Sequence, residues 1–279
     1  MREPDWLRIE QIIETALQED IGSGDITTES LFPTDKKTKA VITAKESGVV
    51  AGLSVAERVF KKLDQNIVWH EKKRDGDRVE PQDILAEIEG LQKAILKGER
   101  VALNFLQRLS GIATLTSKFV NSVEGLPVKI LDTRKTVPGL RILDKYAVRI
   151  GGGSNHRFGL FDGILIKENH IKLAGSITEA VRSVRERGPH LLKIEVETKN
   201  LEEVKEALSA GADIIMLDNM PIETIKEALE IIKGRALTEV SGGINLENVR
   251  KIAETGVDFI SIGALTHSPP ALDIALYMV

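Results

Sequence analysis

Apolar runs and amphipathic helical runs alternate from about residue 126 to the C-terminus. The later apolar runs end at an almost constant spacing, at Glu197, Asp218, Ser241 and Gly263, with steps of 21, 23 and 22 residues. Repeats of this kind place parallel strands in one sheet and helices outside it. The regular spacing favours a β/α barrel over an open doubly wound sheet. Because there are six or seven strand candidates, we expect the barrel to be incomplete.

The N-terminal part of the chain has a different pattern. A helical pattern covers residues 6–20, short strand-like runs with polar turns follow, and a long helical pattern covers 97–125, with an interruption expected near Gly111. This mixture predicts an α+β domain over residues 1–112, followed by a barrel domain over 113–279. The last helix of the barrel domain could pack back on the N-terminal domain.

Composition excludes several classes of protein. The chain of 279 residues contains no cysteine, so it has no disulfide framework and no thiol nucleophile. A net charge of -4 argues against a general nucleic-acid binder. No apolar run reaches the length of a membrane span, and the N-terminus lacks the apolar core of a signal peptide. We therefore expect a cytoplasmic protein.

Charged side chains gather where the predicted strands end. They are Arg134, Lys135, Lys167, Glu195, Glu197 and Asp218. Active sites of β/α barrels lie at this end of the strands, and an arginine fork matches a carboxylate or a phosphate. Residues 132–172 also have eight Lys or Arg against four Asp or Glu. The pattern predicts a site for a ligand with several negative charges; the alternative is that these groups form structural ion pairs.

Glycine-rich turns follow two of the later strands. The run SGG occupies 241–243, and Gly263 follows the next strand. Backbone N–H groups in such turns can bind a phosphate, and phosphate sites recur at the late strands of β/α barrels. We expect a phosphate here; the alternative is that the glycines only make tight turns.

The run GGGSNHRFG, 151–159, is the most unusual local feature. Three consecutive glycines disfavour both helix and strand, and Asn155, His156 and Arg157 follow them. A chain that keeps three such glycines needs unusual backbone dihedrals or a close approach of the backbone to another group, and all three side chains can donate hydrogen bonds. In another predicted strand, Glu195 and Glu197 are two residues apart and therefore lie on the same face. If Glu197 points into the barrel, Glu195 does too, and a charge in a core suggests function.

Taken together, these motifs resemble the quinolinate phosphoribosyltransferase family, also called carboxylating nicotinate-nucleotide pyrophosphorylases. The resemblance runs in order along nearly the whole chain, and TRKT, GGGxNHR and IKxNH together make it specific. The matching runs are EDIGSGDITT (19–28), GERVALNFLQRLSGIAT (98–114), DTRKTVPGLR (132–141), KYAVRIGGGSNHRFGLFDGILIKENH (145–170), IEVE (194–197), LDN (217–219), SGGI (241–244) and IGALTHS (262–268).

The resemblance implies a fold, a reaction and an assembly. The fold is a mixed α/β N-terminal domain with an incomplete α/β barrel, which agrees with the pattern above. The reaction joins quinolinate to phosphoribosyl pyrophosphate with Mg²⁺ and gives nicotinate mononucleotide, pyrophosphate and CO₂ in de novo NAD synthesis. The assembly is a homodimer with a shared active site, in which the N-terminal domain of one subunit covers the barrel mouth of the other.

By the same resemblance, the glycines 151–153 would let the loop bend so that Asn155, His156 and Arg157 turn into the mouth of the barrel. The quinolinate carboxylates would contact Arg134, His156 and Arg157, and Arg100 would join them across the dimer. Lys45 stands where some family members have arginine. A lysine there could meet pyrophosphate as a point charge but without the bidentate fork.

The remaining roles that the resemblance implies concern the donor substrate. Lys135 and Lys167 would lie between the dicarboxylate and the pyrophosphate, and Glu197 and Asp218 would hold ribose hydroxyls and help to place Mg²⁺. The 5-phosphate would be bound by Ser241, Gly242, Gly243 and Gly263.

Three other interpretations remain open at this point. The chain could be a relative with another acceptor, such as nicotinate or the substrate of a molybdenum-operon homologue. It could be another phosphate-binding barrel, an isomerase or a synthase, although that leaves GGGSNHR unexplained. Residues 74–94 also resemble the hairpin of lipoyl or biotinyl carrier domains, with Lys93 near the attachment position.

Overall fold

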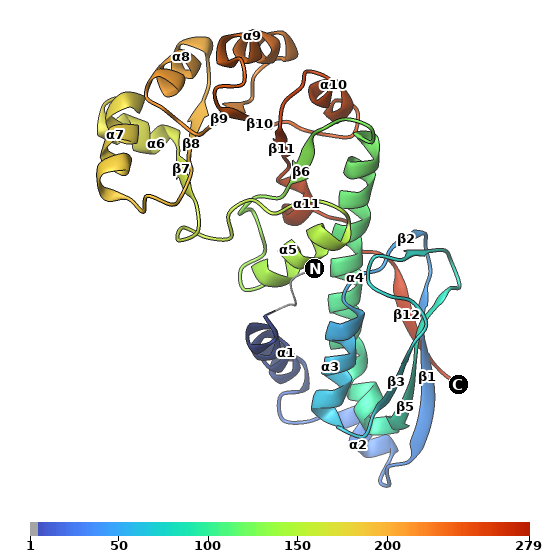
Figure 1. Ribbon diagram of the computed structural model, residues 1–279. Coiled ribbons are helices and arrows are strands. Elements are labelled where there is room, and N and C mark those ends of the chain that lie inside the picture. Colours follow the sequence, from blue (N-terminus) through green and yellow to red (C-terminus); the bar gives the residue numbers. More distant parts are fainter. Residues whose placement is uncertain (1–4) are drawn as a thin grey trace. The chain divides into compact units, whose positions relative to one another are not determined.

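The computed structural model describes residues 5–279, which form two compact units (Figure 1). The first unit contains the chain up to Ser117, residues 136–152 and residues 265–279, and the second contains residues 118–135 and 153–264. The sequence pattern places one boundary after residue 112, whereas packing returns two later segments to the first unit.

An antiparallel sheet with strand order β12-β1-β5-β3 forms one layer of the first unit. Its strands are β1 (Lys37–Ala44), β3 (Val68–Glu71), β5 (Ile84–Leu91) and β12 (Ile274–Met278). The last helix was expected to pack back on the N-terminal domain. Residues 265–279 do belong to the first unit, but their last element is strand β12, which pairs with β1 from Ala40 opposite Met278 to Ala44 opposite Ile274. Ile274 and Leu276 alternate with less buried residues, which is the period of a strand.

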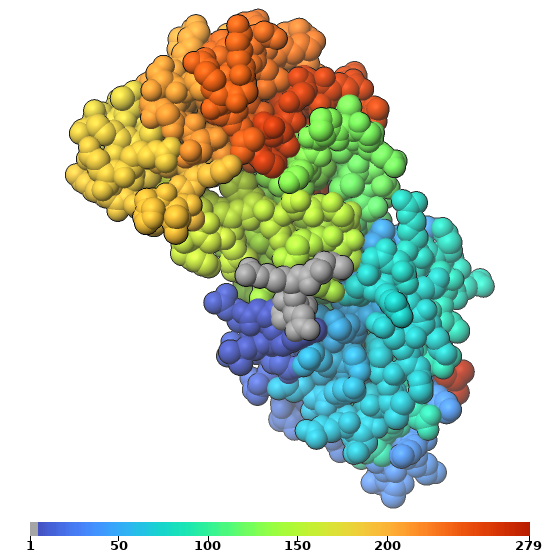
Figure 2. All heavy atoms as spheres, viewed as in Figure 1, coloured from blue at the N-terminus to red at the C-terminus, as the bar shows by residue number. Residues whose placement is uncertain are grey.

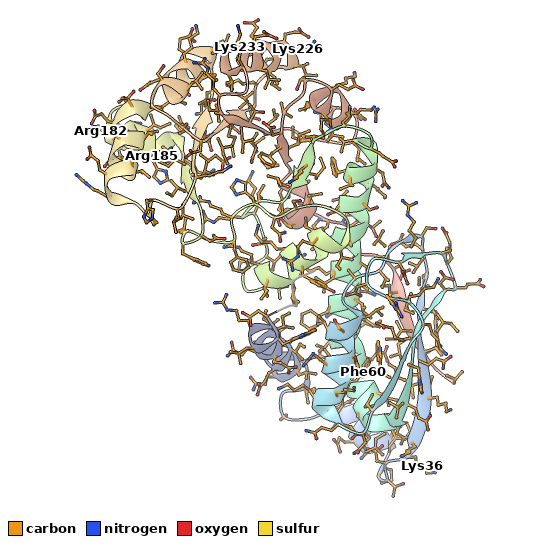
Figure 3. All side chains as sticks on the ribbon, viewed as in Figure 1. Lys36, Phe60, Arg182, Arg185, Lys226 and Lys233 are labelled. Atoms are coloured by element: carbon orange, nitrogen blue, oxygen red, sulfur yellow. The ribbon has the colours of Figure 1, made fainter. Side chains whose placement is uncertain are left out.

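Helices form the other layer of the first unit, together with a short pair of strands. These elements are α1 (Trp6–Ile21), α2 (Ile26–Leu31), β2 (Gly48–Val49), α3 (Leu53–Leu63), β4 (Arg78–Val79), α4 (Gln92–Ser122) and α5 (Arg141–Ile150). Helix α1 confirms the predicted helix over 6–20. Helix α3 was not predicted from the sequence. Its Phe60 side chain is fully buried (Figure 3), and the centroid of this ring lies 6.2 Å from that of the Trp69 ring.

Helix α4 runs without a break over 31 residues, so the predicted interruption at Gly111 is wrong. A Cβ atom added at Gly111 would lie 2.0 Å from the carbonyl oxygen of Pro270. The glycine therefore permits close packing of the helix against another segment of the same unit, which offsets the roughly 1 kcal/mol that glycine costs inside a helix.

A six-stranded parallel sheet forms the second unit, in the order β6-β11-β10-β9-β8-β7. Its strands are β6 (Lys129–Leu131), β7 (Ile164–Ile166), β8 (Ile194–Thr198), β9 (Ile214–Asp218), β10 (Leu237–Ser241) and β11 (Phe259–Ser261). Within the described residues β6 and β7 stand at opposite edges and do not pair, so the predicted incomplete β/α barrel is confirmed.

Helices cover the outside of this sheet. They are α6 (Glu168–Ala174), α7 (Ile177–Arg187), α8 (Leu201–Ser209), α9 (Ile222–Ile232) and α10 (Val249–Ala253), and α11 (Ala264–His267) follows β11. Helices α7, α8 and α9 lie side by side as the yellow and orange layer of Figure 2. Charged side chains of this layer, including Arg182 and Lys226, point away from the sheet (Figure 3). None of the helices formed by residues 5–279 combines the length and apolar character needed to cross a bilayer.

A buried ion pair joins two helices of the first unit. Asp144 on α5 is fully buried and accepts two hydrogen bonds from Arg108 on α4, at 2.9 Å from Nε and 2.8 Å from Nη2. It also accepts the backbone N–H of Val137. Burial raises the pKa of the Asp144 carboxyl, and Arg108 opposes this rise. The pair fixes α5, the helix that leads directly into Gly151.

We expect Arg108→Ala to lower the free energy of unfolding by about 3 kcal/mol, because it leaves a buried carboxylate without its cation. Urea unfolding followed by circular dichroism measures this loss. Lys226→Ala, which removes an exposed ion pair to Glu223, is the control and should cost less than about 1 kcal/mol. Equal, small losses for both variants would contradict a structural role for the Arg108 pair.

Candidate active site

The carboxyl ends of the strands in the second unit carry the charged groups that the sequence singled out. Arg134 and Lys135 follow β6, Lys167 follows β7, Glu197 lies near the end of β8, and Asp218 ends β9. Because the six strands are parallel, these positions belong to one edge of the sheet. The predicted gathering of these residues is therefore present in the fold.

One cation and one carboxylate at this edge already form an ion pair. Lys167 Nζ donates to Glu197 Oε2 at 3.1 Å, between neighbouring strands β7 and β8. The Lys167 side chain is 49% exposed and Glu197 only 13%. The alternative that these charged groups form structural ion pairs therefore holds for Lys167 and Glu197, but about half of the Lys167 side chain remains accessible to solvent.

The loop 151–159 begins with close packing inside the first unit. A Cβ atom at Gly151 would lie 2.4 Å from the carbonyl oxygen of Ala113 on α4, and Gly152 has a φ of 89°. Both positions therefore need glycine. The chain then enters the second unit, where Ser154 N–H donates to the carbonyl of Ile130 at 2.8 Å and continues the edge of the sheet beside β6.

Asp132 holds the next part of this loop. Its fully buried carboxylate accepts Asn155 Nδ2 at 2.6 Å and the backbone N–H of His156 at 2.9 Å. Asn155 was predicted to turn into the barrel mouth, but its amide donates to Asp132 and secures the loop. Asp132 was not among the predicted site residues. Its place directly after an apolar strand was the available signal.

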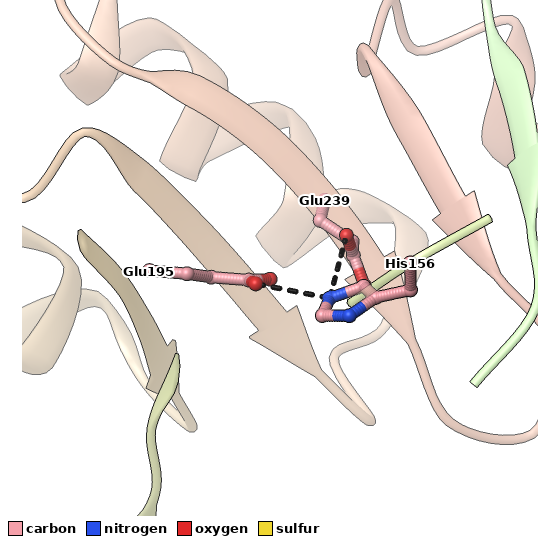
Figure 4. A group of neighbouring side chains, drawn as sticks. All are labelled: His156, Glu195 and Glu239. Carbon is pink, nitrogen blue, oxygen red and sulfur yellow. Dashed lines mark hydrogen bonds and ion pairs between the residues drawn. The ribbon is translucent and has the colours of Figure 1, made fainter. Parts of the chain in front are cut away.

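His156 lies against two buried glutamates, Glu195 on β8 and Glu239 on β10 (Figure 4). His156 Nε2 is 3.0 Å from Glu195 Oε2 and 3.7 Å from Glu239 Oε2. The glutamates are only 4% and 2% exposed. We call these three residues the His156 cluster. Glu195 lies inside the barrel, as the strand pattern suggested, and its part in function stays a prediction. Glu239 was missed, although an acid inside the apolar run ALTEV was a visible signal.

The buried charges of this region shift the ionisation of their neighbours. Burial raises the pKa of Glu239 to about 7, the charge of Glu195 adds to this rise, and His156 and Ser261 oppose it. The pKa of Arg157 is lowered by burial and by the charge of Arg134, while Glu195 opposes this shift. Two guanidinium groups are therefore held within electrostatic reach of each other.

Arg157 is only partly paired by the protein. Its Nη1 donates to the carbonyl of Gly163 at 3.1 Å. Its Nε is buried, and no acceptor within residues 5–279 reaches it. A buried donor without an acceptor is costly. A bound anion would accept a hydrogen bond from this Nε and would reduce the repulsion between Arg157 and Arg134.

The predicted phosphate turn follows β10. Gly242 and Gly243 have φ values of 90° and 66°. The turn is held from both sides, because the Asn219 N–H donates to the carbonyl of Ser241 and Asn248 Nδ2 donates to the carbonyl of Gly243, each at 2.9 Å. Gly263 follows β11, the neighbouring strand in the sheet.

Three further lysine and arginine positions lie in the first unit. Arg100 is an exposed residue of α4, and Lys45 pairs with Asp273 at 3.5 Å. Their contacts with substrate stay predictions.

Lys93 lies in the first turn of α4, with its side chain only 18% exposed and 3.7 Å from Glu29. A carrier lysine is presented on a hairpin, so this geometry does not support the carrier interpretation.

Glu239→Gln should change how stability depends on pH. The native carboxyl keeps its proton up to about pH 7, whereas the unfolded carboxyl loses it near 4.5. The free energy of unfolding of the parent protein therefore falls across this interval as pH rises. Glutamine has no proton to lose, so we expect the variant to be more stable, relative to the parent, at about pH 8 than at about pH 5.

Urea unfolding at both pH values measures this difference. Glu227→Gln on the exposed face of α9 controls for the loss of a surface charge. A stability offset between Glu239→Gln and the parent that does not change with pH would contradict the ionisation assigned to Glu239.

Family models match both parts of the chain. The model of the N-terminal domain of quinolinate phosphoribosyl transferase matches residues 25–110, and that of its C-terminal domain matches residues 112–277. The two matches leave only residue 111 between them.

Curated relatives and solved structures agree with these matches. The probable nicotinate-nucleotide pyrophosphorylase [carboxylating] of Bacillus subtilis is 46% identical over 97% of this chain and 93% of its own length. The chloroplastic nicotinate-nucleotide pyrophosphorylase [carboxylating] of Arabidopsis thaliana is 47% identical over 96% of this chain and 82% of its own length. The crystal structure of the pyrophosphorylase from Ehrlichia chaffeensis is 45% identical, covers 100% of both chains and has a TM-score of 0.94. The chain belongs to the quinolinate phosphoribosyltransferase family.

Proposed function

We propose that this protein transfers the phosphoribosyl group of phosphoribosyl pyrophosphate to quinolinate and releases CO₂ and pyrophosphate, giving nicotinate mononucleotide for NAD synthesis. One observation carries the acceptor assignment. Arg157 is half-buried within reach of the charge of Arg134, and its buried Nε lacks an acceptor among residues 5–279. Family membership supports the reaction itself.

Two guanidinium groups suit a ligand with two carboxylates. Each planar guanidinium can donate two parallel hydrogen bonds to one carboxylate, so Arg134 and Arg157 together match quinolinate. In a dimer, Arg100 would add a third cation. Nicotinate has a single carboxylate and would leave part of this charge uncompensated. The proposal therefore favours the dicarboxylate over the nicotinate alternative.

The donor substrate would lie across the neighbouring strand ends. Backbone N–H groups of Ser241–Gly243, with Gly263 beside them, would bind the 5-phosphate. Glu197 and Asp218 would hold the ribose hydroxyls. Their carboxylate oxygens are the hard donors that Mg²⁺ prefers. Asp218 accepts a hydrogen bond from the neutral amide of Asn219 at 3.0 Å and forms no ion pair within residues 5–279, which leaves its charge available.

The chemistry needs charge placement rather than an enzyme nucleophile. Mg²⁺ would neutralise charge on the departing pyrophosphate. Lys135 and Lys167 add positive charge on the side between the two substrates. As the bond from C1 of the ribose to pyrophosphate breaks, positive charge grows on the sugar, and Glu197 or Asp218 stabilises it electrostatically. The pyridine nitrogen attacks C1 of the ribose from the opposite face. The C2 carboxylate then leaves as CO₂, the electron pair of the broken bond stays on C2 beside the cationic ring nitrogen, and C2 takes up a proton from solvent. The protein orients both substrates.

A homodimer and a cytoplasmic location form part of the same proposal. The first unit exposes large apolar side chains on α1 and α2, with Leu7 76%, Ile26 81% and Leu31 64% exposed. A second copy that covered these side chains would remove their apolar surface from water. Size-exclusion chromatography with light scattering would test the dimer by measuring the molar mass of the protein in solution.

The first experiment is a product assay. The protein, Mg²⁺ and phosphoribosyl pyrophosphate are mixed with either quinolinate or nicotinate, and mononucleotide mass and released CO₂ are followed. Product and CO₂ from quinolinate alone are expected. Product from nicotinate alone would overturn the role of the arginine pair, and no product from either acceptor would overturn the function.

Arg157→Lys should raise the KM for quinolinate about tenfold or more, because lysine keeps the charge but loses the bidentate fork. The KM for phosphoribosyl pyrophosphate and the melting temperature should change little. Arg182→Lys on the exposed face of α7 is the matched control. Similar changes in both KM values would argue against an acceptor role for Arg157.

A further inference from the structure

The His156 cluster carries an inference that deepens the proposed function and rests on it. We propose that Glu195 and Glu239 are positioning residues that hold His156 by Nε2, so that His156 anchors the loop 151–159 and places Arg157 for the acceptor. In this arrangement His156 does not itself bind a substrate carboxylate. The resemblance to the family implies such a direct contact, so the two roles make different predictions.

Both nitrogens of the His156 ring already have partners in the protein. Nδ1 accepts the backbone N–H of Arg157 at 2.8 Å. An accepting nitrogen carries no proton, so the proton of the neutral ring lies on Nε2. Nε2 donates to Glu195 Oε2 at 3.0 Å. A substrate carboxylate needs a donor, and neither nitrogen has a donor to spare while these two hydrogen bonds persist.

The glutamates reach His156 from two strands that do not pair with each other. Strand β9 lies between β8 and β10 in the sheet. Glu239 is level with Met216 of β9, and Glu195 is level with Ile214. The imidazole therefore ties the loop to the interior of the sheet at two strands. Removing it would leave two buried carboxylates without this partner, which is costly.

The anchor acts next to Arg157 in the chain and in the structure. The backbone N–H of Arg157 is fixed by the imidazole, and the backbone N–H of His156 is fixed by Asp132 at 2.9 Å. The Arg157 side chain continues to the carbonyl of Gly163. Two successive N–H groups are thus immobilised directly before the guanidinium that the proposed function assigns to quinolinate.

Charge placement agrees with this division of roles. The negative charge of Glu195 stabilises the charged form of Arg157, which burial and Arg134 destabilise. The glutamates therefore support Arg157 in two ways, through the imidazole and through their charge. They would repel a carboxylate that approached His156 itself.

The test uses substitutions of Glu195 that match its size. Glu195→Met removes the acceptor for Nε2, whereas Glu195→Gln keeps an accepting oxygen. We expect Glu195→Met to raise the KM for quinolinate about tenfold, the value of one lost hydrogen bond to a charged group. The KM for phosphoribosyl pyrophosphate should stay within about twofold, and Glu195→Gln should restore most of the quinolinate KM. Equal changes in both KM values, with no rescue by glutamine, would overturn the proposal.

Two double-mutant cycles separate anchoring from direct contact. If Glu195 acts through the ring, Glu195→Met should have no further effect on the quinolinate KM in a His156→Phe background. If His156 acts through Arg157, His156→Phe should have little further effect in an Arg157→Ala background. Additive effects of His156→Phe and Arg157→Ala on the quinolinate KM would show two independent contacts and overturn the anchoring role.

Ring nitrogen NMR tests the same anchor without activity. The His156 signals are assigned by their loss in His156→Phe. We expect Nε2 protonated and Nδ1 unprotonated, with and without quinolinate. Protonation of Nδ1 when quinolinate is added would overturn the proposal. A stoichiometric divalent metal in the purified protein that is lost in Glu195→Met would also overturn it, because a metal would then replace the Nε2 proton. Failure of the parent protein to use quinolinate would instead refute the proposed function, and the NMR readout would still decide the anchor.

Discussion

Buried charge in the second unit has to be compensated, and the loop 151–159 supplies the partners. Asp132, Glu195 and Glu239 are almost fully removed from water, which is expensive for a carboxylate unless it is hydrogen-bonded or protonated. The Asn155 side chain and the His156 backbone satisfy Asp132, and the His156 ring faces both glutamates. If the loop moved away, these buried carboxylates would lose their hydrogen-bond partners, so the loop is held in place.

This constraint determines where the positive charge of the site lies. Arg157 follows His156 directly, and its guanidinium is held within reach of the charge of Arg134 despite burial. Both cations are half-buried, so a bound anion would reduce the repulsion between them. The lysines and carboxylates at the other strand ends then fall beside that anion, because the strands are parallel and end at one edge. Acceptor and donor substrates can thus share a single edge of the sheet.

Local patterns predicted some parts of the fold well and failed where packing decided. The apolar runs predicted as strands after residue 126 appear as β6 to β11, because their apolar character reflects burial on both faces of a parallel sheet. The break expected at Gly111 was wrong, because that glycine admits the carbonyl of Pro270. The last segment is a strand because β1 offers an edge to pair with. Pro270 is far from Gly111 in the sequence, and β1 is far from the C-terminal strand, so local patterns contain neither contact.

The same division applies to the candidate site. The sequence by itself determined the repeated strands, their common carboxyl edge and therefore the gathering of Arg134, Lys135, Lys167, Glu197 and Asp218, since the period of the pattern fixes which end of each strand they occupy. Only the tertiary structure decided the partners of His156, because Glu195 and Glu239 are 39 and 83 residues away along the chain. Hydrogen bonds depend on distances of about 3 Å and on direction, and such geometry arises only when separate strands and a loop have packed together.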